Sequence, residues 1–167
     1  RIIPFYGIHP WYVDDVEESA LEKLESRAEG ERCGIGEIGL DGNKSSFPRQ
    51  EECFARQVEL AIRLDRPFAI HCVDAWGPLL EALRGRDLDG RRFMLHAFNG
   101  SMDVLAELIE MGAYVSYSVR GLEGRTEKTI SALRATPHDR LLLETDFPYL
   151  MAKDEPRTAD FYRGRIA

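Results

Sequence analysis

Cysteine pairs, long apolar runs and surplus positive charge are what this sequence lacks. It has three cysteines, Cys33, Cys53 and Cys72, without CxxC spacing, which argues against a disulfide framework and favours a reducing compartment. We therefore expect a cytoplasmic protein. No apolar run approaches the roughly 18 residues that a membrane span requires, so no membrane partner is expected.

Basic residues do not dominate the charge. Lysine and arginine total 22, whereas aspartate and glutamate total 29, and the formal net charge is −7 at pH 7. This balance excludes a protein coated with positive charge for nucleic-acid binding. It leaves open a local basic groove, or a site in which a bound metal ion supplies the positive charge.

Six short apolar runs, rich in residues that favour strands, alternate with longer amphipathic stretches. The runs are Ile2–Ile8, Cys33–Leu40, Pro67–Cys72, Phe93–Phe98, Ala113–Ser118 and Leu141–Thr145. Their apolar residues are continuous rather than alternating, which is typical of parallel strands covered on both faces.

The stretches between the runs carry apolar side chains at helical spacing. One of them places Val16, Leu24 and Ala28 on the same helix face, and another is bounded by Ser101, a suitable N-cap, and Gly112, a suitable end. Strand–helix alternation predicts an α/β fold with a parallel sheet or barrel. Right-handed crossovers would bring the carboxyl ends of all its strands to one face, where active sites lie.

Residues able to bind metal recur at the ends of these runs. His9, Glu37, His71, His96 and Asp146 each fall on a different run, in steps that match β/α units of about 30 residues. A single buried imidazole or carboxylate is satisfied by hydrogen bonds in many cores, but five at one height of the sheet favour a shared site. Histidines and carboxylates together suit a hydrolytic divalent ion, with Zn, Mn and Mg as the alternatives.

Five motifs that contain these residues resemble one known family. They are Gly7-Ile8-His9-Pro10, Gly36-Glu37-Ile38-Gly39-Leu40-Asp41, Ile70-His71-Cys72, His96-Ala97-Phe98-Asn99-Gly100 and Glu144-Thr145-Asp146-Phe147-Pro148-Tyr149-Leu150. In this order they look like the TatD family of metal-dependent deoxyribonucleases, within the amidohydrolase-like barrel superfamily. The resemblance implies a (β/α)8 TIM-type barrel that binds one or two divalent ions (Mg, Mn or Zn). It also implies that a metal-activated water cleaves DNA phosphodiester bonds.

The resemblance also implies a role for each site residue. The implied metal ligands are Glu37, His71, His96 and Asp146. Glu37 would be shared between metal positions, and Asp146 would lie beside the nucleophilic water as a general base. His9 would face the substrate or support the ligands, while Asp41 and Glu144 would orient the ligands from behind.

The match to the family is incomplete at both ends of the chain. A full barrel needs about 250 residues, and this sequence has 167. The His-x-His pair of the family's first strand has no counterpart here. We therefore expect residues 1–167 to form a single, partial barrel domain, about units two to seven, with the first strand and the C-terminal helices absent.

Several alternatives for function stay open. Val73 stands where the family often has arginine, which favours a hydrolase of a small ester, amide or phosphoester. The missing His-x-His pair favours a non-catalytic family member. If DNA is the substrate, we expect a monomer acting on a single strand or an end, with bases stacked on aromatic residues such as Trp11, Trp76 and Phe98 and phosphates near Lys44.

Overall fold

A computed structural model of the chain describes residues 2–17, 19–118, 127–146 and 158. Its centre is a six-stranded sheet in which the strands follow the order of the chain. The strands are β1 (Phe5–Tyr6), β2 (Gly34–Asp41), β3 (Phe68–Val73), β4 (Phe93–Leu95), β5 (Tyr114–Ser118) and β6 (Leu141–Glu144). Every neighbouring pair is parallel, which confirms the predicted α/β fold with a parallel sheet.

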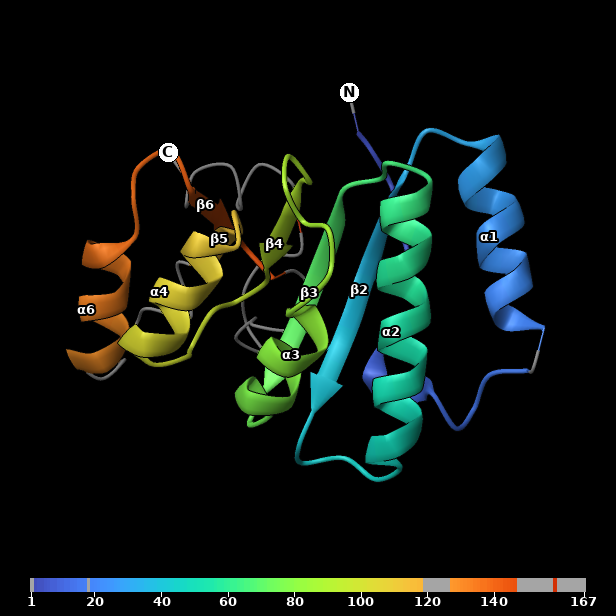
Figure 1. The fold of residues 1–167 in the computed structure, drawn as a ribbon, viewed down its shortest axis with the longest axis horizontal. Helices are drawn as coiled ribbons and strands as arrows, with labels where there is room; N and C mark the ends of the chain where they lie inside the picture. Colours follow the sequence, from blue (N-terminus) through green and yellow to red (C-terminus); the bar gives the residue numbers. More distant parts are fainter. Residues whose placement is uncertain (1, 18, 119–126, 147–157, 159–167) are drawn as a thin grey trace.

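Helices connect the strands and cover the sheet. They are the 3-10 helix η1 (Pro10–Tyr12) and the α-helices α1 (Ala20–Gly30), α2 (Phe47–Arg63), α3 (Trp76–Leu83), α4 (Met102–Glu110) and α6 (Glu127–Ala135). Figure 1 shows α2, α3 and α4 side by side in front of the sheet. Within the described residues β1 and β6 each have one pairing neighbour, so this part of the sheet is open, as expected for a partial barrel.

The core lies between this helix layer and the strands. On β2, Ile35 and Ile38 have no exposed surface, and on α2 neither does Val58. Phe68 of β3 and Phe93 of β4 stack with ring centroids 5.1 Å apart. Most residues of β2 and β3 are buried, so both faces of these two strands are covered, as their continuous apolar runs indicate. On β6, by contrast, Leu142 and Leu143 are 36% and 50% exposed.

The helix α4 begins and ends where the sequence predicts, whereas α1 begins later. The Ser101 hydroxyl accepts a hydrogen bond from the Val104 N–H at the start of α4, and Gly112 follows the helix with a φ of +87°, so both predictions are confirmed. The prediction that Val16 belongs to the first helix is wrong, since α1 begins at Ala20. Among the described residues no helix has the length and apolar character of a membrane span.

Gly39 allows β2 and β3 to approach closely beside the polar strand ends. It is paired with His71 in the sheet, and its φ is +147°. A Cβ atom at this position would lie 1.9 Å from the His71 carbonyl oxygen, which is a steric overlap with backbone. Only glycine fits, and the fit fixes the height of β3 relative to β2.

We expect Gly39→Ala to lower the unfolding free energy of the intact protein by roughly 2–4 kcal/mol, because it combines backbone strain with overlap. Urea denaturation measures the loss. Gly77→Ala is the matched control, since Gly77 lies in α3 with nothing within 4 Å of an added Cβ. An unchanged midpoint for Gly39→Ala would contradict the close approach of the strands.

Candidate metal and catalytic site

A cavity of about 560 Å³ opens at the carboxyl ends of the strands. Its lining residues are Phe5, His9, Trp11, Tyr12, Gly36, Glu37, His71, Cys72, Val73, His96, Ala97, Asn99 and Asp146. All five residues that the sequence pattern placed at strand ends are among them. Because parallel strands present these ends at one face, the side chains meet in a single depression.

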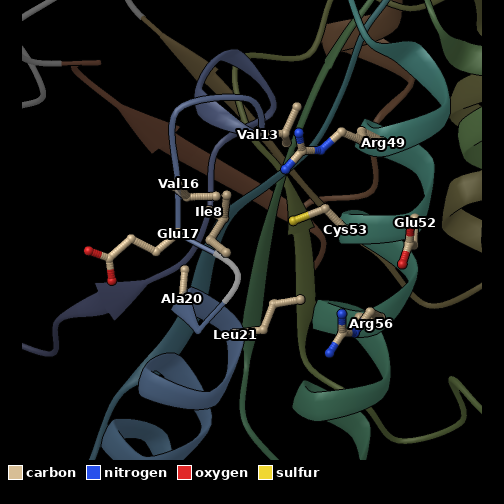
Figure 2. Close-up of a pocket in the computed structure, with 10 residues that line it drawn as sticks. All are labelled: Ile8, Val13, Val16, Glu17, Ala20, Leu21, Arg49, Glu52, Cys53 and Arg56. Carbon is tan, nitrogen blue, oxygen red and sulfur yellow. The ribbon is translucent and has the colours of Figure 1, made fainter.

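A second, smaller cavity of about 210 Å³ has different chemistry (Figure 2). It lies between α2, which contributes Arg49 and Cys53, and the segment that runs from Ile8 to Leu21. Its lining is a mixture of apolar and surface charged residues without a histidine. Of these two cavities, the larger therefore contains the candidate metal ligands.

His9, Glu37 and His71 form a compact cluster of potential metal ligands. Their ligand atoms all lie within 4.8 Å of one another. The His9 Nε2 atom is 3.8 Å from Glu37 Oε2, and the centroids of the two imidazole rings are 4.5 Å apart. This separation suits donors that surround a common cation.

Glu37 also faces a second group of ligands. Its Oε1 atom is 3.8 Å from His96 Nε2, and the same nitrogen is 3.2 Å from Asp146 Oδ1. One carboxylate thus stands between two sets of donors, as a ligand shared by two metal positions would. Asp146 holds a left-handed backbone with φ +53°, a conformation that is rare outside glycine and recurs at functional sites.

One buried nitrogen tests whether a cation fits this cavity. His71 Nε2 is buried and has no hydrogen-bond partner, and Asp41 Oδ2, 3.8 Å away, is beyond hydrogen-bond distance. A buried polar atom without a partner is costly. A divalent ion held by imidazole nitrogens and carboxylate oxygens would satisfy it, so the residues fit such an ion.

Glu144 contacts the His96 ring through its Nδ1 atom. Its Oε2 atom lies 2.9 Å from His96 Nδ1 and accepts a hydrogen bond from the Ser116 hydroxyl. With Nδ1 engaged, the ring presents Nε2 to Glu37 and Asp146. A carboxylate in this position could orient the ring of a metal ligand, and the Ser116 hydroxyl in turn bonds to this carboxylate.

Two buried glutamines of α2 hold the backbone beneath the site. Gln57 accepts from the Ile8 N–H at 2.7 Å and donates to the Ile8 carbonyl at 3.1 Å, just before His9. Gln50 makes the same pair of bonds with the backbone of Asp41. Sequence reasoning did not assign these roles, although two glutamines seven residues apart on a buried helix face were a readable signal.

The aromatic residues divide into two groups. Trp11 and Tyr12 line the cavity and are 42% and 49% exposed. The expectation that Phe98 contacts a substrate is wrong, because Phe98 is 3% exposed. Trp76 packs against it, with ring centroids 5.1 Å apart.

The last of the five motifs is described only as far as Asp146, and its remaining residues, 147–150, lie outside the described residues.

The model of the family described as TatD related DNase matches residues 1–162. The chain belongs to the TatD family. Among curated relatives, the 3'-5' ssDNA/RNA exonuclease TatD of Klebsiella pneumoniae is 35% identical over 165 residues, covering 92% of this chain and 60% of its own length. The uncharacterized metal-dependent hydrolase YabD of Bacillus subtilis is 31% identical over 170 residues, which cover 96% of this chain and 67% of the length of YabD.

Solved structures agree with this TatD membership. The TatD homolog YJJV from Escherichia coli superposes with a TM-score of 0.82 at 27% identity, over 91% of this chain and 60% of that one. The phosphotriesterase homology protein from Escherichia coli superposes with a TM-score of 0.60 at 23% identity, over 86% of this chain and 56% of that one. At this identity the similarity shows the fold alone. The predicted TIM-type barrel is therefore confirmed as the fold class. This TatD-family chain spans about 60% of the length of YJJV.

The imidazoles of this TatD-family site differ in protonation. Burial, together with the neighbouring His71, lowers the pKa of His9 to about 4, and burial lowers that of His71. Burial also opposes protonation of His96, but hydrogen bonds to Asp146 and Glu144 outweigh it and raise the pKa of His96 to about 10. Without a cation, His96 is thus the charged imidazole among these three.

Metal binding should release a proton from His96 but not from His9. A coordinating imidazole must be neutral; at neutral pH His96, with its pKa of about 10, carries a proton, and His9, with a pKa of about 4, does not. We expect the parent to release about one proton more than His96→Gln and as many as His9→Gln. Calorimetric titration in two buffers of different ionisation enthalpy gives the count. Equal release by the parent and His96→Gln would contradict this assignment.

Proposed function

We propose that this TatD-family chain is the catalytic part of a metal-dependent phosphodiesterase that cleaves DNA at a single-stranded region or end. The observation that carries the proposal is the position of Glu37, whose two oxygens face His9 and His96 at 3.8 Å each. Residues 1–167 would act as one domain, a part of the barrel. The three free cysteines suit the reducing cytoplasm.

Glu37, His71, His96 and Asp146 would hold the metal, with His9 beside them. The unpartnered Nε2 atom of His71 supports this assignment. Two imidazole donors favour Zn or Mn over Mg, which prefers oxygen ligands and retains much of its water. A divalent ion in such a site lowers the pKa of water toward neutrality and so supplies a nucleophile.

Asp146 is suited to receive the proton of the attacking water. It lines the cavity beside Glu37, and its Oδ1 atom is 3.2 Å from His96 Nε2. A carboxylate next to the reacting water is a suitable general base. The Glu144 contact holds His96 in place while Asp146 exchanges protons.

Exposed aromatic residues support a nucleic-acid substrate with free base faces. Phe5, Trp11 and Tyr12 are 40%, 42% and 49% exposed on the cavity wall. Lys44 Nζ lies 4.7 Å from the centroid of the Trp11 ring, and places a cation near the wall. Aromatic rings beside a cation suit stacked bases and phosphates, and the stacked interior of a duplex offers no free base face.

A small ester or phosphoester is the second candidate substrate. Val73 lies in the cavity wall, where a basic residue would have contacted phosphate. An apolar side chain there suits a smaller or less charged substrate. Rates on single-stranded oligonucleotides, duplexes and nitrophenyl esters separate the two candidates.

We expect Asp146→Asn to lower the rate of oligonucleotide hydrolysis roughly 10²–10⁴-fold, because the amide cannot accept the proton. EDTA should also abolish hydrolysis, and Zn or Mn should restore it. Asp139→Asn is the matched control, since Asp139 is exposed and outside the cavity. Full activity of Asp146→Asn, or activity that survives EDTA, would refute the proposed mechanism.

We expect Tyr12→Leu to raise KM for single-stranded DNA roughly tenfold, because stacking on an aromatic side chain contributes about 1–3 kcal/mol per base. Steady-state kinetics measure KM, and kcat should change less. Tyr6→Leu is the control, since Tyr6 lies in β1, with its hydroxyl bonded to Glu31 rather than in the cavity. An unchanged KM for Tyr12→Leu would rule out stacking on this residue.

A further inference from the structure

Trp11 belongs both to the cavity wall and to the support of the metal ligands. Trp11 is 42% exposed and lines the cavity. Its indole N–H donates to Asp41 Oδ2 at 2.6 Å. An exposed aromatic residue is therefore bonded directly to a carboxylate that is 3% exposed.

Hydrogen bonds hold the backbone of Asp41 and both oxygens of its carboxylate, and Trp11 makes the bond to Oδ2. The Asn43 N–H donates to Oδ1 at 2.9 Å. Gln50 fixes the backbone of Asp41 at both its N–H and its carbonyl. The position of Oδ2 then depends on the indole N–H of Trp11, which donates to it at 2.6 Å.

The Oδ2 atom of Asp41 lies near His71 Nε2, the nitrogen that would bind the metal. His71 Nε2 is 3.8 Å from Asp41 Oδ2 and has no hydrogen-bond partner. The rings of Trp11 and His71 also meet edge to face, with centroids 6.1 Å apart. If the indole donor were lost, Oδ2 would be free to turn toward His71 Nε2, 3.8 Å away. A hydrogen bond between them would place the imidazole proton on Nε2 and so occupy the ligand atom.

We propose that Trp11 is a positioning residue for the metal site: its indole N–H holds Asp41 Oδ2 away from His71 Nε2 and keeps that nitrogen available to the cation. This role rests on the metal site of the proposed function. Through its hydrogen bond to Asp41, Trp11 would link the wall of the cavity to the metal ligands. A change that displaces Trp11 from the wall would therefore also lower the affinity for metal.

Cobalt binding to the intact protein tests this role without any substrate. Trp11→Phe keeps an aromatic ring and removes the donor. We expect its affinity for Co²⁺, followed by the visible absorption of the bound ion, to fall about tenfold, the lower end of the effect of removing a residue that supports a metal ligand. Trp76→Phe is the matched control, because Trp76 packs on Phe98 and should leave cobalt affinity unchanged.

A double-mutant cycle tests whether Trp11 acts through Asp41. In an Asp41→Ala background, Trp11→Phe should cause no further loss of cobalt affinity. The inference is overturned if Trp11→Phe binds Co²⁺ as tightly as the parent, or if the two losses add. A parent that binds cobalt but does not hydrolyse DNA would refute the proposed substrate and leave this role supported. A parent that binds no cobalt would overturn both the metal site and the role of Trp11.

Discussion

The site depends on one carboxylate held between imidazoles. Glu37 projects from β2 at a register shift between Ile35 and Ile38, and it faces both His9 and His96. Burial, followed by the nearby carboxylates, raises the pKa of Glu37. A negative charge in this position is favourable only if positive charge accompanies it. In the metal-free chain the proton on His96 supplies part of that charge, and a divalent cation would replace it.

The rest of the fold supplies the rigidity that this arrangement needs. The strand ends are not held by sheet hydrogen bonds alone, because the backbone at Ile8 and Asp41 is bonded to Gln57 and Gln50 of α2. Both glutamine side chains are fully buried. Bonds from a packed helix therefore fix the segment after β1, which leads into His9, and the end of β2, which carries Asp41.

Sequence periodicity was sufficient for a parallel sheet and for the meeting of its polar strand ends, because right-handed crossovers bring those ends to one face. It left an open sheet and a barrel as alternatives, and only the family resemblance favoured the barrel. Periodicity overestimated β1: the run Ile2–Ile8 predicts a longer strand, but only Phe5–Tyr6 pairs with β2. At Ile8 a glutamine side chain takes the place of a neighbouring strand. Residue type also could not separate Trp11, on the cavity wall, from Phe98, in the core, because each follows a strand and the difference depends on packing around it.

A chain of net charge −7 can still accept a polyanion if the positive charge is local. The cavity gathers three imidazoles and two carboxylates, and Lys44 lies over the Trp11 ring beside it. A bound cation would make this the positive centre of an otherwise acidic surface, and the protein would repel DNA elsewhere. If phosphate contacts are limited to the site, DNA binding would be weak. Under the proposed function, selectivity would then depend on the exposed aromatic residues of the cavity, Phe5, Trp11 and Tyr12, which suit unpaired bases whatever their sequence.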